Sequence, residues 1–353
     1  MKRHVDCIKM ASNENPFGPS PKAIRAMQAA VNECNFYPDN DSSKLRQKLA
    51  VQHQISPEQV LVAAGLTSLI GIICRRLLKP GLNAVSSQRS FIVYSIATKA
   101  TGAQLIEVPM KEDGFDLDSI IEAINSDTRV VFLANPNNPT GTVFDAAALD
   151  RFLARIPEHV IVIVDEAYYE FAQYFAQQRK IEYSHSLNYV REGRKVVVLR
   201  TFSKAHGLAG LRVGYGIGPA ELMADLARMR TTFSVSVPAQ AAALAALDDD
   251  AHIERAVKNN AAVADLLSGE LTRLGYRVVP TWANFVYCDL RRNASEFAKW
   301  MQAGGVIIRA LGAWGAPTAI RVTIGTPEQN ERFLTVVRKV MEQAPGRPDT
   351  LNS

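Results

Sequence analysis

The sequence of 353 residues predicts an α/β fold, with a large domain built on a mostly parallel sheet covered by helices and a smaller α+β domain beside it. Two observations carry this prediction. From about residue 58 onward, short apolar runs rich in β-branched residues alternate with amphipathic stretches of helical periodicity. Most of these runs are apolar throughout, as in strands that a parallel sheet buries on both faces.

The expected elements follow one another along the chain in a strand–helix alternation. The strands of the large domain cover residues 60–62, 84–85, 104–106, 130–133, 160–164 and 196–199. Helical patterns cover residues 68–78, 116–124 and 145–155, and a long region rich in alanine and leucine covers about 220–247. The smaller unit has expected strands at residues 276–279, 285–288, 306–308 and 320–324.

These elements define the predicted domain boundaries. The large domain, which would bind the cofactor inferred below, covers residues 40–245. An N-terminal segment, residues 1–39, joins a small C-terminal domain of residues 246–353. We expect the polar tail from residue 344 to be frayed.

Composition and charge limit the class of protein. The chain has 47% apolar and 21% charged residues and a formal net charge of +5, with no long basic run that would indicate nucleic acid binding. No apolar run approaches the roughly 18 residues of a membrane span, and the first ten residues lack the apolar segment of a signal peptide. The cysteines (Cys7, Cys34, Cys74 and Cys288) have no metal-type spacing, so we expect reduced thiols, no metal site and a cytoplasmic protein.

Polar residues follow four of the expected strands, where an open parallel sheet binds its ligands. Residues 65–68 (GLTS) follow the first strand, residues 135–141 (NPNNPTG) the fourth and residues 165–168 (DEAY) the fifth. After the strand at 196–199, Lys204 stands in a stretch that is otherwise almost all small, apolar or glycine. Lysine side chains usually lie on the solvent-exposed surface, so a lysine in such a stretch needs an explanation.

Each motif by itself also has a purely structural interpretation. Asparagine, proline and glycine form turns, which would account for residues 135–141. Thr67 or Ser68 could cap a helix that begins there, and the acidic pair Asp165-Glu166 could cap the helix that follows it. For any one motif alone, these alternatives stay open.

Together, the four motifs supply the groups that would bind pyridoxal 5'-phosphate. A helix N-terminus with Ser203 and Arg212 can hold a phosphate. A carboxylate such as Asp165 can keep a pyridine nitrogen protonated, while a tyrosine and an amide can bind a phenolic oxygen. Lys204, as a desolvated amine, can form a Schiff base with the cofactor aldehyde, whose ring acts as an electron sink.

The order of the motifs along the chain resembles that of the fold-type I pyridoxal-phosphate aminotransferases, and within them the histidinol-phosphate aminotransferase family. The resemblance covers nearly the whole chain. Its motifs are residues 12–16 (SNENP), 37–38 (YP), 137–141 (NNPTG), 165–168 (DEAY), 201–204 (TFSK), 210–212 (GLR) and 320–325 (IRVTIG). One of these motifs is weak evidence; all of them in this order are strong evidence.

The resemblance implies the cofactor site. It implies that Lys204 forms the Schiff base and then moves the proton between the substrate α-carbon and the cofactor, that Asp165 pairs with the pyridinium nitrogen, and that Asn138 and Tyr168 bind the ring oxygen. Lys204, Asp165 and Tyr168 are the implied catalytic residues. Phe91 would stack on the ring. The implied phosphate-binding residues are Leu66, Thr67, Thr201, Ser203 and Arg212.

The resemblance also implies the assembly and the substrate site. Tyr37 would reach the cofactor phosphate from a neighbouring subunit, so a homodimer is implied. Arg321 would bind the carboxylate or phosphate of the substrate, with Asn13 and Arg309 lining the same mouth.

The leading hypothesis for function is a ping-pong aminotransferase. It would convert histidinol phosphate and 2-oxoglutarate into imidazole acetol phosphate and glutamate, a step of histidine biosynthesis. The alternative donor is an aromatic amino acid, phenylalanine or tyrosine, with its ring near Tyr94 or Trp314. A decarboxylase on the same fold and a cofactor-binding protein without turnover are further alternatives, and the complete set of implied catalytic residues counts against the last.

Overall fold

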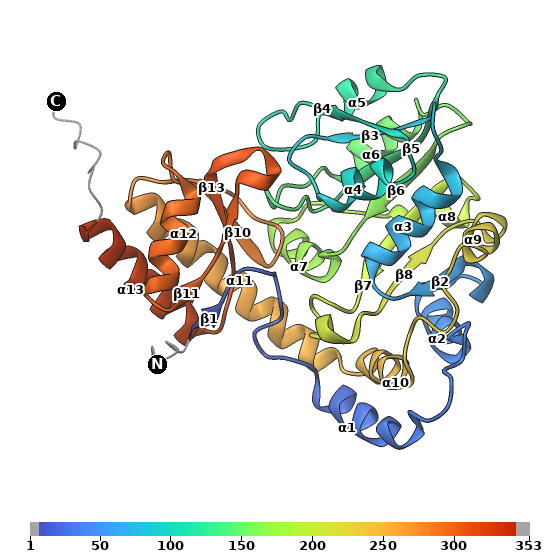
Figure 1. The fold of residues 1–353 in the computed structure, drawn as a ribbon, viewed down its shortest axis with the longest axis horizontal. Helices are drawn as coiled ribbons and strands as arrows, with labels where there is room; N and C mark the ends of the chain where they lie inside the picture. Colours follow the sequence, from blue (N-terminus) through green and yellow to red (C-terminus); the bar gives the residue numbers. More distant parts are fainter. Residues whose placement is uncertain (1–6, 344–353) are drawn as a thin grey trace.

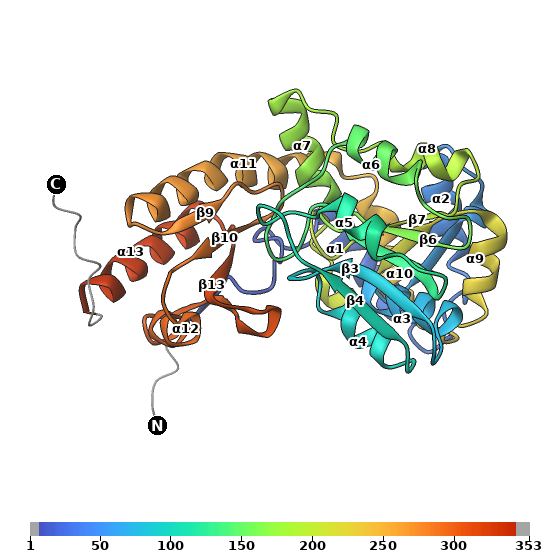
Figure 2. The same cartoon turned by 90° about the horizontal axis from the view of Figure 1, so that it is seen from above.

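The computed structural model describes residues 7–343 and shows two lobes side by side (Figure 1). The large lobe, residues 43–246, is built on a seven-stranded sheet. The small lobe, residues 274–343 with the N-terminal strand β1 (Ile8–Lys9), is built on a four-stranded sheet. Helix α11 (Asp250–Arg273) packs against the small-lobe sheet and reaches α7 of the large lobe (Figure 2). The tail expected to be frayed lies outside the described residues.

The seven-stranded sheet has the strand order β2-β8-β7-β6-β5-β3-β4, and all its strand pairs except those of β8 are parallel. This confirms the predicted mostly parallel sheet. Every strand expected for this domain overlaps a strand of the structure. The strands are β2 (Val60–Ala63), β3 (Asn83–Ser87), β4 (Gln104–Val108), β5 (Thr128–Ala134), β6 (Ile161–Asp165), β7 (Val196–Thr201) and β8 (Gly214–Ile217).

Both faces of this sheet are covered, which explains why its strands are apolar throughout. Val131 and Leu133 of β5 belong to one buried apolar cluster, whereas Val130 and Phe132 of the same strand belong to another. Alternate side chains of a strand point to opposite faces, so each face needs its own apolar set. The helices that cover the faces are α2 (Ser43–His53), α3 (Leu66–Leu77), α4 (Val93–Lys99), α5 (Leu117–Ala123), α6 (Ala146–Leu153), α8 (Ser186–Arg191), α9 (Ala220–Ala227) and α10 (Val237–Ala246). Helix α7 (Tyr169–Arg179) packs against α11 instead.

Strand β8 was not expected, because glycine disfavours strands and two of its four residues are glycine. The packing around the strand explains them. A Cβ on Gly216 would lie 3.3 Å from the side chain of Leu199, and one on Gly214 would lie 3.0 Å from the backbone nitrogen of Leu66. The two glycines therefore stand where neighbouring groups leave little room for a Cβ.

The long helical region expected over about residues 220–247 is helical but interrupted. The structure has two helices there, α9 and α10, separated by residues 228–236. Phe233 in this break has a left-handed backbone (φ 55°), and its N–H donates to Asn40 Oδ1 at 2.8 Å. The Ser236 hydroxyl then caps α10. Alanine and leucine content alone did not show the break.

The small-lobe sheet is antiparallel, with the order β12-β13-β10-β9. Its strands are β9 (Arg277–Val279), β10 (Phe285–Asp289), β12 (Arg309–Leu311) and β13 (Ala316–Thr323), flanked by α12 (Ala294–Ala303) and α13 (Pro327–Gln343). Strand β1 pairs with β11 (Val306–Ile307), whereas α1 (Pro21–Ala30) packs on α10 of the large lobe. The N-terminal segment therefore contacts both lobes, and the predicted domain boundaries stay a prediction. Among residues 7–343, no helix combines the length and apolarity that crossing a membrane requires.

Gly207 allows the backbone of the N-terminal segment to lie close against the loop that carries Lys204. Its φ is 72°, and an added Cβ would lie 2.0 Å from the carbonyl oxygen of Gly18. We predict that Gly207→Ala lowers the free energy of unfolding by about 3 kcal/mol or more, because left-handed strain and a backbone clash add together. The measurement is denaturant or thermal unfolding of the purified protein.

The matched control for this prediction is Gly275→Ala. Gly275 has a φ of 86°, but nothing lies within 4 Å of the position that its Cβ would take. It should therefore lose only the strain contribution, about 1–2 kcal/mol. Equal losses for the two variants would show that the contact between Gly207 and Gly18 does not constrain the fold.

Candidate active site

A cavity of about 360 Å³ lies between the two lobes, at the carboxyl ends of the parallel strands. It brings together every site residue that the sequence analysis named, with the exception of Tyr37. The large lobe contributes Leu66, Thr67, Phe91, Asn138, Asp165, Tyr168, Thr201, Ser203, Lys204 and Arg212. The small lobe contributes Arg309 and Arg321, and the N-terminal segment contributes Asn13. Residues more than 300 positions apart thus share one cavity.

Lys204 enters the cavity from the loop that follows β7. Its Nζ donates to the carbonyl oxygen of Ser12 at 3.1 Å. Burial, reinforced by the positive charges of Arg321 and Arg212, lowers the pKa of this amine to about 7. A lysine with such a pKa is partly uncharged near neutral pH, which is the form that acts as a nucleophile or accepts a proton. The position and the lowered pKa of Lys204 therefore suit a nucleophile or a proton acceptor.

Asp165 ends strand β6 and is 4% exposed. Burial raises the pKa of its carboxyl group to about 6, opposed by two hydrogen bonds that favour the carboxylate. The hydroxyl of Tyr94 donates to Oδ2 at 2.7 Å, and the N–H of Ala167 donates to Oδ1 at 3.1 Å. The helix-cap alternative is wrong, because α7 begins at Tyr169 without a side-chain cap.

The contact of Tyr94 with Asp165 was missed in the sequence analysis. Tyr94 was considered as a neighbour of an aromatic substrate, but its hydroxyl group is bound to Asp165 and its ring stacks on Phe132, with centroids 4.6 Å apart. Phe91, three residues earlier, meets the Tyr94 ring edge-on at 5.7 Å. Phe91 precedes α4, and the N–H of Tyr94 donates to its carbonyl oxygen at 3.0 Å, so the two aromatics are joined by a turn and not by a helix face. Tyr94 lines the cavity and orients Asp165 there.

Glu166, the second acid of the DEAY motif, points away from the cavity. Its carboxylate accepts from Arg200 Nε and Nη2 at 3.0 and 2.8 Å, and from the hydroxyls of Ser184 and Ser186. The guanidinium of Arg200 also lies 3.5 Å from the centre of the Tyr169 ring. This fully paired buried cluster ties β6 to β7 behind the site.

The N-terminus of α3 and Arg212 form an anion-binding corner. Gly65 (φ 79°), and neither Thr67 nor Ser68, is the N-cap residue, and no side chain caps the helix. Its first N–H groups are therefore left for a ligand. Arg212 Nη1 donates to Ser203 Oγ at 3.3 Å, and its Nη2 lies 2.5 Å from the point that a Gly65 Cβ would occupy. A side chain at position 65 would displace the guanidinium.

Tyr168 and Asn138 line the cavity from the two loops that follow β6 and β5. The hydroxyl of Tyr168 accepts from Asn13 Nδ2 at 2.8 Å. Asn13 has a left-handed backbone (φ 57°), and its own N–H donates to Thr323 Oγ1 at 2.9 Å. The side-chain oxygen of Asn138 accepts from Arg321 Nη1. These bonds tie the N-terminal segment and the small lobe to the polar loops of the large lobe.

Arg321 is a buried cation that lacks a buried anion. It is 5% exposed, and its Nη2 donates to the carbonyl oxygen of Ala11 at 2.9 Å. Its Nε has no partner among the described residues. Burial, with a contribution from Arg309, lowers the pKa of the guanidinium to about 10. Burying a charge without a counter-charge is costly, so this arrangement is suited to an anionic ligand.

Tyr37 lies outside the cavity. It is 82% exposed, and its ring stacks on Phe233 with centroids 4.7 Å apart. Its neighbour Phe36 is 68% exposed. Exposed aromatic side chains gathered in this way are typical of a surface that another molecule covers.

The groups in the cavity fit pyridoxal 5'-phosphate. Uncapped helix N–H groups with Arg212 and Ser203 suit its phosphate, and Asp165 is a single carboxylate placed to pair with a protonated ring nitrogen. The lowered pKa of Lys204 suits an amine that reacts with an aldehyde. The phosphate, the ring nitrogen and the aldehyde of the cofactor would each have a suitable partner among these groups.

Comparisons with known proteins agree with this site. The sequence model of the family described as aminotransferase class I and II matches residues 5–337. A histidinol-phosphate aminotransferase of Akkermansia muciniphila is 44% identical over 337 residues, which cover 95% of this chain and 90% of the relative. One of Moorella thermoacetica is 41% identical over 337 residues, covering 95% and 86%. The solved structure of histidinol-phosphate aminotransferase from Sinorhizobium meliloti in complex with pyridoxal-5'-phosphate superposes with a TM-score of 0.87 at 27% identity, covering 95% of this chain and 91% of that chain.

The hydrogen bond from Tyr94 to Asp165 predicts a pH-dependent defect. Tyr94→Phe removes a donor to the carboxylate, so the pKa of Asp165 should rise above about 6. Near pH 6 to 7 the carboxylate would then be less ionised, and the affinity for pyridoxal phosphate should fall roughly tenfold. The loss should shrink towards pH 9, where Asp165 is ionised in both proteins. Cofactor titration followed by absorbance measures it.

Tyr183→Phe is the matched control. Tyr183 is also buried, but its hydroxyl donates to the backbone carbonyl of Asn135, which does not titrate. Any loss in this variant should be the same at all pH values. If the Tyr94→Phe loss were equally independent of pH, the hydrogen bond would not control the charge of Asp165.

Proposed function

The chain belongs to the class I and II aminotransferase family, and we propose that within it the protein is a histidinol-phosphate aminotransferase. In this proposal, histidinol phosphate donates its amino group in the first half-reaction of a ping-pong cycle. The second half-reaction passes the group to 2-oxoglutarate and releases glutamate. Members of the family use pyridoxal phosphate, and the cavity fits it.

The proposed roles of the residues follow from their environments. When bound, pyridoxal phosphate supplies an electron-withdrawing ring that stabilises the charge developing at the substrate α-carbon. Lys204 Nζ, with its lowered pKa, accepts a proton from that carbon and returns it. Asp165 holds the proton at the ring nitrogen, and Tyr94 holds Asp165. Asn138 and Tyr168 bind the ring oxygen, and Phe91 excludes water from one ring face.

The phosphate of the cofactor is held by a separate set of groups. The residues proposed for it are Leu66 and Thr67, through their N–H groups, with Thr201, Ser203 and Arg212. A dianion beside a helix N-terminus and a guanidinium has favourable electrostatics. Lys204 lines the same cavity as these residues, so it would be available to the reactive end of a cofactor held by its phosphate.

The observation that supports a phosphorylated donor is the pairing of Arg309 with Arg321. The two residues are directly opposite each other in strands β12 and β13. Like charges at such a position repel, and Arg309 contributes to the lowered pKa of Arg321. A phosphate carries more negative charge than a carboxylate and is matched better by two guanidinium groups. The same fork accepts the carboxylate of glutamate in the second half-reaction.

We also propose that the protein is a homodimer of the cytoplasm. The exposed aromatic surface of Phe36, Tyr37 and Phe233 supports a partner subunit there. Tyr37 would then reach the cofactor phosphate of the partner. The biosynthetic function proposed above supports the location.

The choice of donor is tested by steady-state kinetics of the holoenzyme with 2-oxoglutarate as acceptor. We expect kcat/KM for histidinol phosphate to exceed that for phenylalanine. Arg309→Gln should lower kcat/KM for histidinol phosphate by about tenfold, because a charge-assisted contact to the phosphate is lost. A higher kcat/KM for phenylalanine would assign the protein to the aromatic aminotransferases, and release of carbon dioxide in place of glutamate would make it a decarboxylase.

Arg273→Gln is the control for the loss of one positive charge from the same half of the chain. Arg273 ends α11, and its side chain is 71% exposed. Its removal should leave both specificity constants unchanged. An equal loss in Arg273→Gln and Arg309→Gln would show that net charge, and not the paired arginines, attracts the donor.

The proposed dimer predicts complementation between two inactive chains. Lys204→Ala and Tyr37→Ala remove groups that the proposal places on different subunits of one site. Half of randomly assembled dimers are hybrids with one intact site, so about a quarter of the wild-type activity should return. Lys204→Ala mixed with Asp165→Asn is the control and should stay inactive, because both residues come from one chain. Recovery in neither mixture, or an active monomer in sedimentation, contradicts the arrangement.

A further inference from the structure

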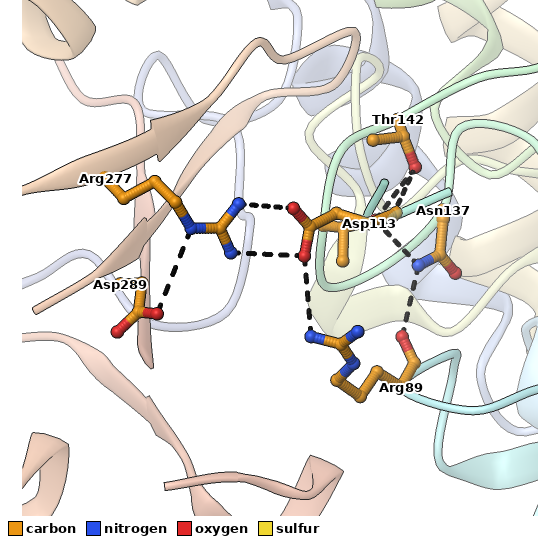
Figure 3. Close-up of polar contacts among 7 residues, drawn as sticks. Arg89, Asp113, Asn137, Thr142, Arg277 and Asp289 are labelled. Atoms are coloured by element: carbon orange, nitrogen blue, oxygen red, sulfur yellow. Dashed lines mark hydrogen bonds and ion pairs between the residues drawn. The ribbon is translucent and has the colours of Figure 1, made fainter. Parts of the chain in front are cut away.

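Three charged residues join the two lobes at a distance from the reacting groups (Figure 3). Asp113, in the turn between β4 and α5 of the large lobe, accepts from Arg277 of β9 in the small lobe. Arg277 Nη1 lies 2.5 Å from Asp113 Oδ2, and its Nη2 lies 3.3 Å from Oδ1. Arg89, which follows β3, approaches the same Oδ1 at 3.4 Å. None of the three lines the cavity described above.

Residues at this contact have a left-handed backbone conformation. Glu112 and Asp113 have φ values of 51° and 61°, and Arg89 has 48°. A residue with a Cβ adopts this left-handed conformation at a cost in free energy, and such residues concentrate at functional positions. Paired backbone hydrogen bonds between Lys111 and Gly114, of 3.1 and 2.8 Å, close the turn that holds Asp113 outward.

The Asp113 carboxylate is more than a surface charge. Its side chain is 11% exposed, whereas that of Arg277 is 43% exposed. The hydrogen bond that Arg277 donates to Asp113 raises the pKa of the Arg277 guanidinium. The largely shielded Asp113 carboxylate accepts two hydrogen bonds from Arg277 and one from Arg89, so it is held more firmly than a carboxylate in an exposed pair.

On the large-lobe side, Asp113 and Arg89 are attached to the segments that form the cavity. Thr142 Oγ1 donates to the carbonyl oxygen of Asp113 at 3.0 Å, and Asn137 Nδ2 donates to that of Arg89 at 3.1 Å. Ser90 Oγ donates to Asn137 Oδ1 at 2.9 Å. The next residues along these two segments, Phe91 and Asn138, line the cavity.

On the small-lobe side, Arg277 belongs to the sheet that carries Arg321. Strand β10 lies between them, and its residue Tyr287 is opposite Val279 of β9 on one side and opposite Arg321 of β13 on the other. Burial raises the pKa of Tyr287, and the nearby Arg89 guanidinium acts in the opposite direction. Arg277 and Arg321 therefore belong to one hydrogen-bonded sheet and are two strand pairings apart.

We propose that Arg89, Asp113 and Arg277 form an inter-lobe clasp that positions the small-lobe sheet, and with it Arg321 and Arg309, over the cavity. Asp113 and Arg277 are positioning residues that touch neither substrate nor cofactor. The proposal rests on the proposed function only for what Arg321 binds; the clasp itself is a property of the two lobes. A displacement of Arg321 and Arg309 weakens their charge-assisted contacts with an anionic substrate, so the clasp bears on substrate affinity.

The test uses the holoenzyme with Asp113→Asn and Arg277→Gln, singly and together. Asparagine tolerates the left-handed backbone of position 113, so the turn is kept while the charge is removed. The matched control is Glu270→Gln. Glu270 is 15% exposed and pairs at 2.7 Å with Arg338, which is 53% exposed, so the burial resembles that of the clasp. That pair joins α11 to α13 and does not cross to the large lobe.

The first readout is hydrogen–deuterium exchange at Trp282, whose N–H donates across the lobes to the carbonyl oxygen of Gly141 at 2.8 Å. We expect the peptide with Trp282 to exchange at least about threefold faster in both clasp variants and at the wild-type rate in Glu270→Gln. The double variant should show less than the sum of the two single effects, because both substitutions remove the pair between Arg277 and Asp113.

The second readout separates positioning from general damage. KM for 2-oxoglutarate and for the amino donor should rise by about threefold to tenfold in the clasp variants, with kcat and cofactor absorbance nearly unchanged. Wild-type exchange at Trp282 in both single variants, additive effects in the double variant, or the same changes in Glu270→Gln would each overturn the proposal. If the wild-type protein transaminates neither donor, the proposed function fails, while Trp282 exchange still decides on the clasp.

Discussion

Lys204 and Arg321 reach one cavity from opposite lobes, and burial lowers the pKa of both groups. The carboxylate of Asp165 also lines this cavity, and burial raises its pKa. Desolvated positive groups in excess of negative ones make the cavity unfavourable until anions enter it. This imbalance organises the rest of the site: one anion belongs beside Arg212 and the N-terminus of α3, and another between Arg309 and Arg321. Because such ligands bind only the folded protein, they also stabilise it.

The parallel sheet of the large lobe makes this imbalance possible. Strands β6 and β7 are buried on both faces, so the chain can end each of them with a polar residue at one dry edge. The pleat then separates two adjacent acids. Asp165 lines the cavity, whereas Glu166 pairs with Arg200 in a fully satisfied cluster that fastens the strands from behind. Asp165 is left available for a ligand, whereas Glu166 stabilises the strands behind the site.

The small lobe and the N-terminal segment complete a site that the large lobe does not contain by itself. Strand β1 pairs with β11, and Asn13 then joins Thr323 of the small lobe to Tyr168 of the large lobe. The proposed clasp lies farther out, where Asp113 meets Arg277. The arginines proposed to bind the substrate are on one lobe and the groups proposed to bind the cofactor are on the other, so this proposal requires the lobes to keep a defined separation. Contacts away from the chemistry therefore contribute to it.

The amino-acid sequence by itself determined the strand–helix alternation of the large lobe and predicted most of the residues that line the cavity. Apolar runs and polar strand ends are local patterns, and parallel strands bring their carboxyl ends together, so Lys204, Asp165 and Arg212 were identifiable without coordinates. The tertiary structure decided what depends on contacts between distant residues. It decided the glycines of β8, the break before α10 and the pairing of Arg309 opposite Arg321. It also decided the hydrogen bond from Tyr94 to Asp165 and the ion pair between Asp113 and Arg277. Each is set by strand register or side-chain packing across many residues of chain, which leaves no periodic signal in the local sequence.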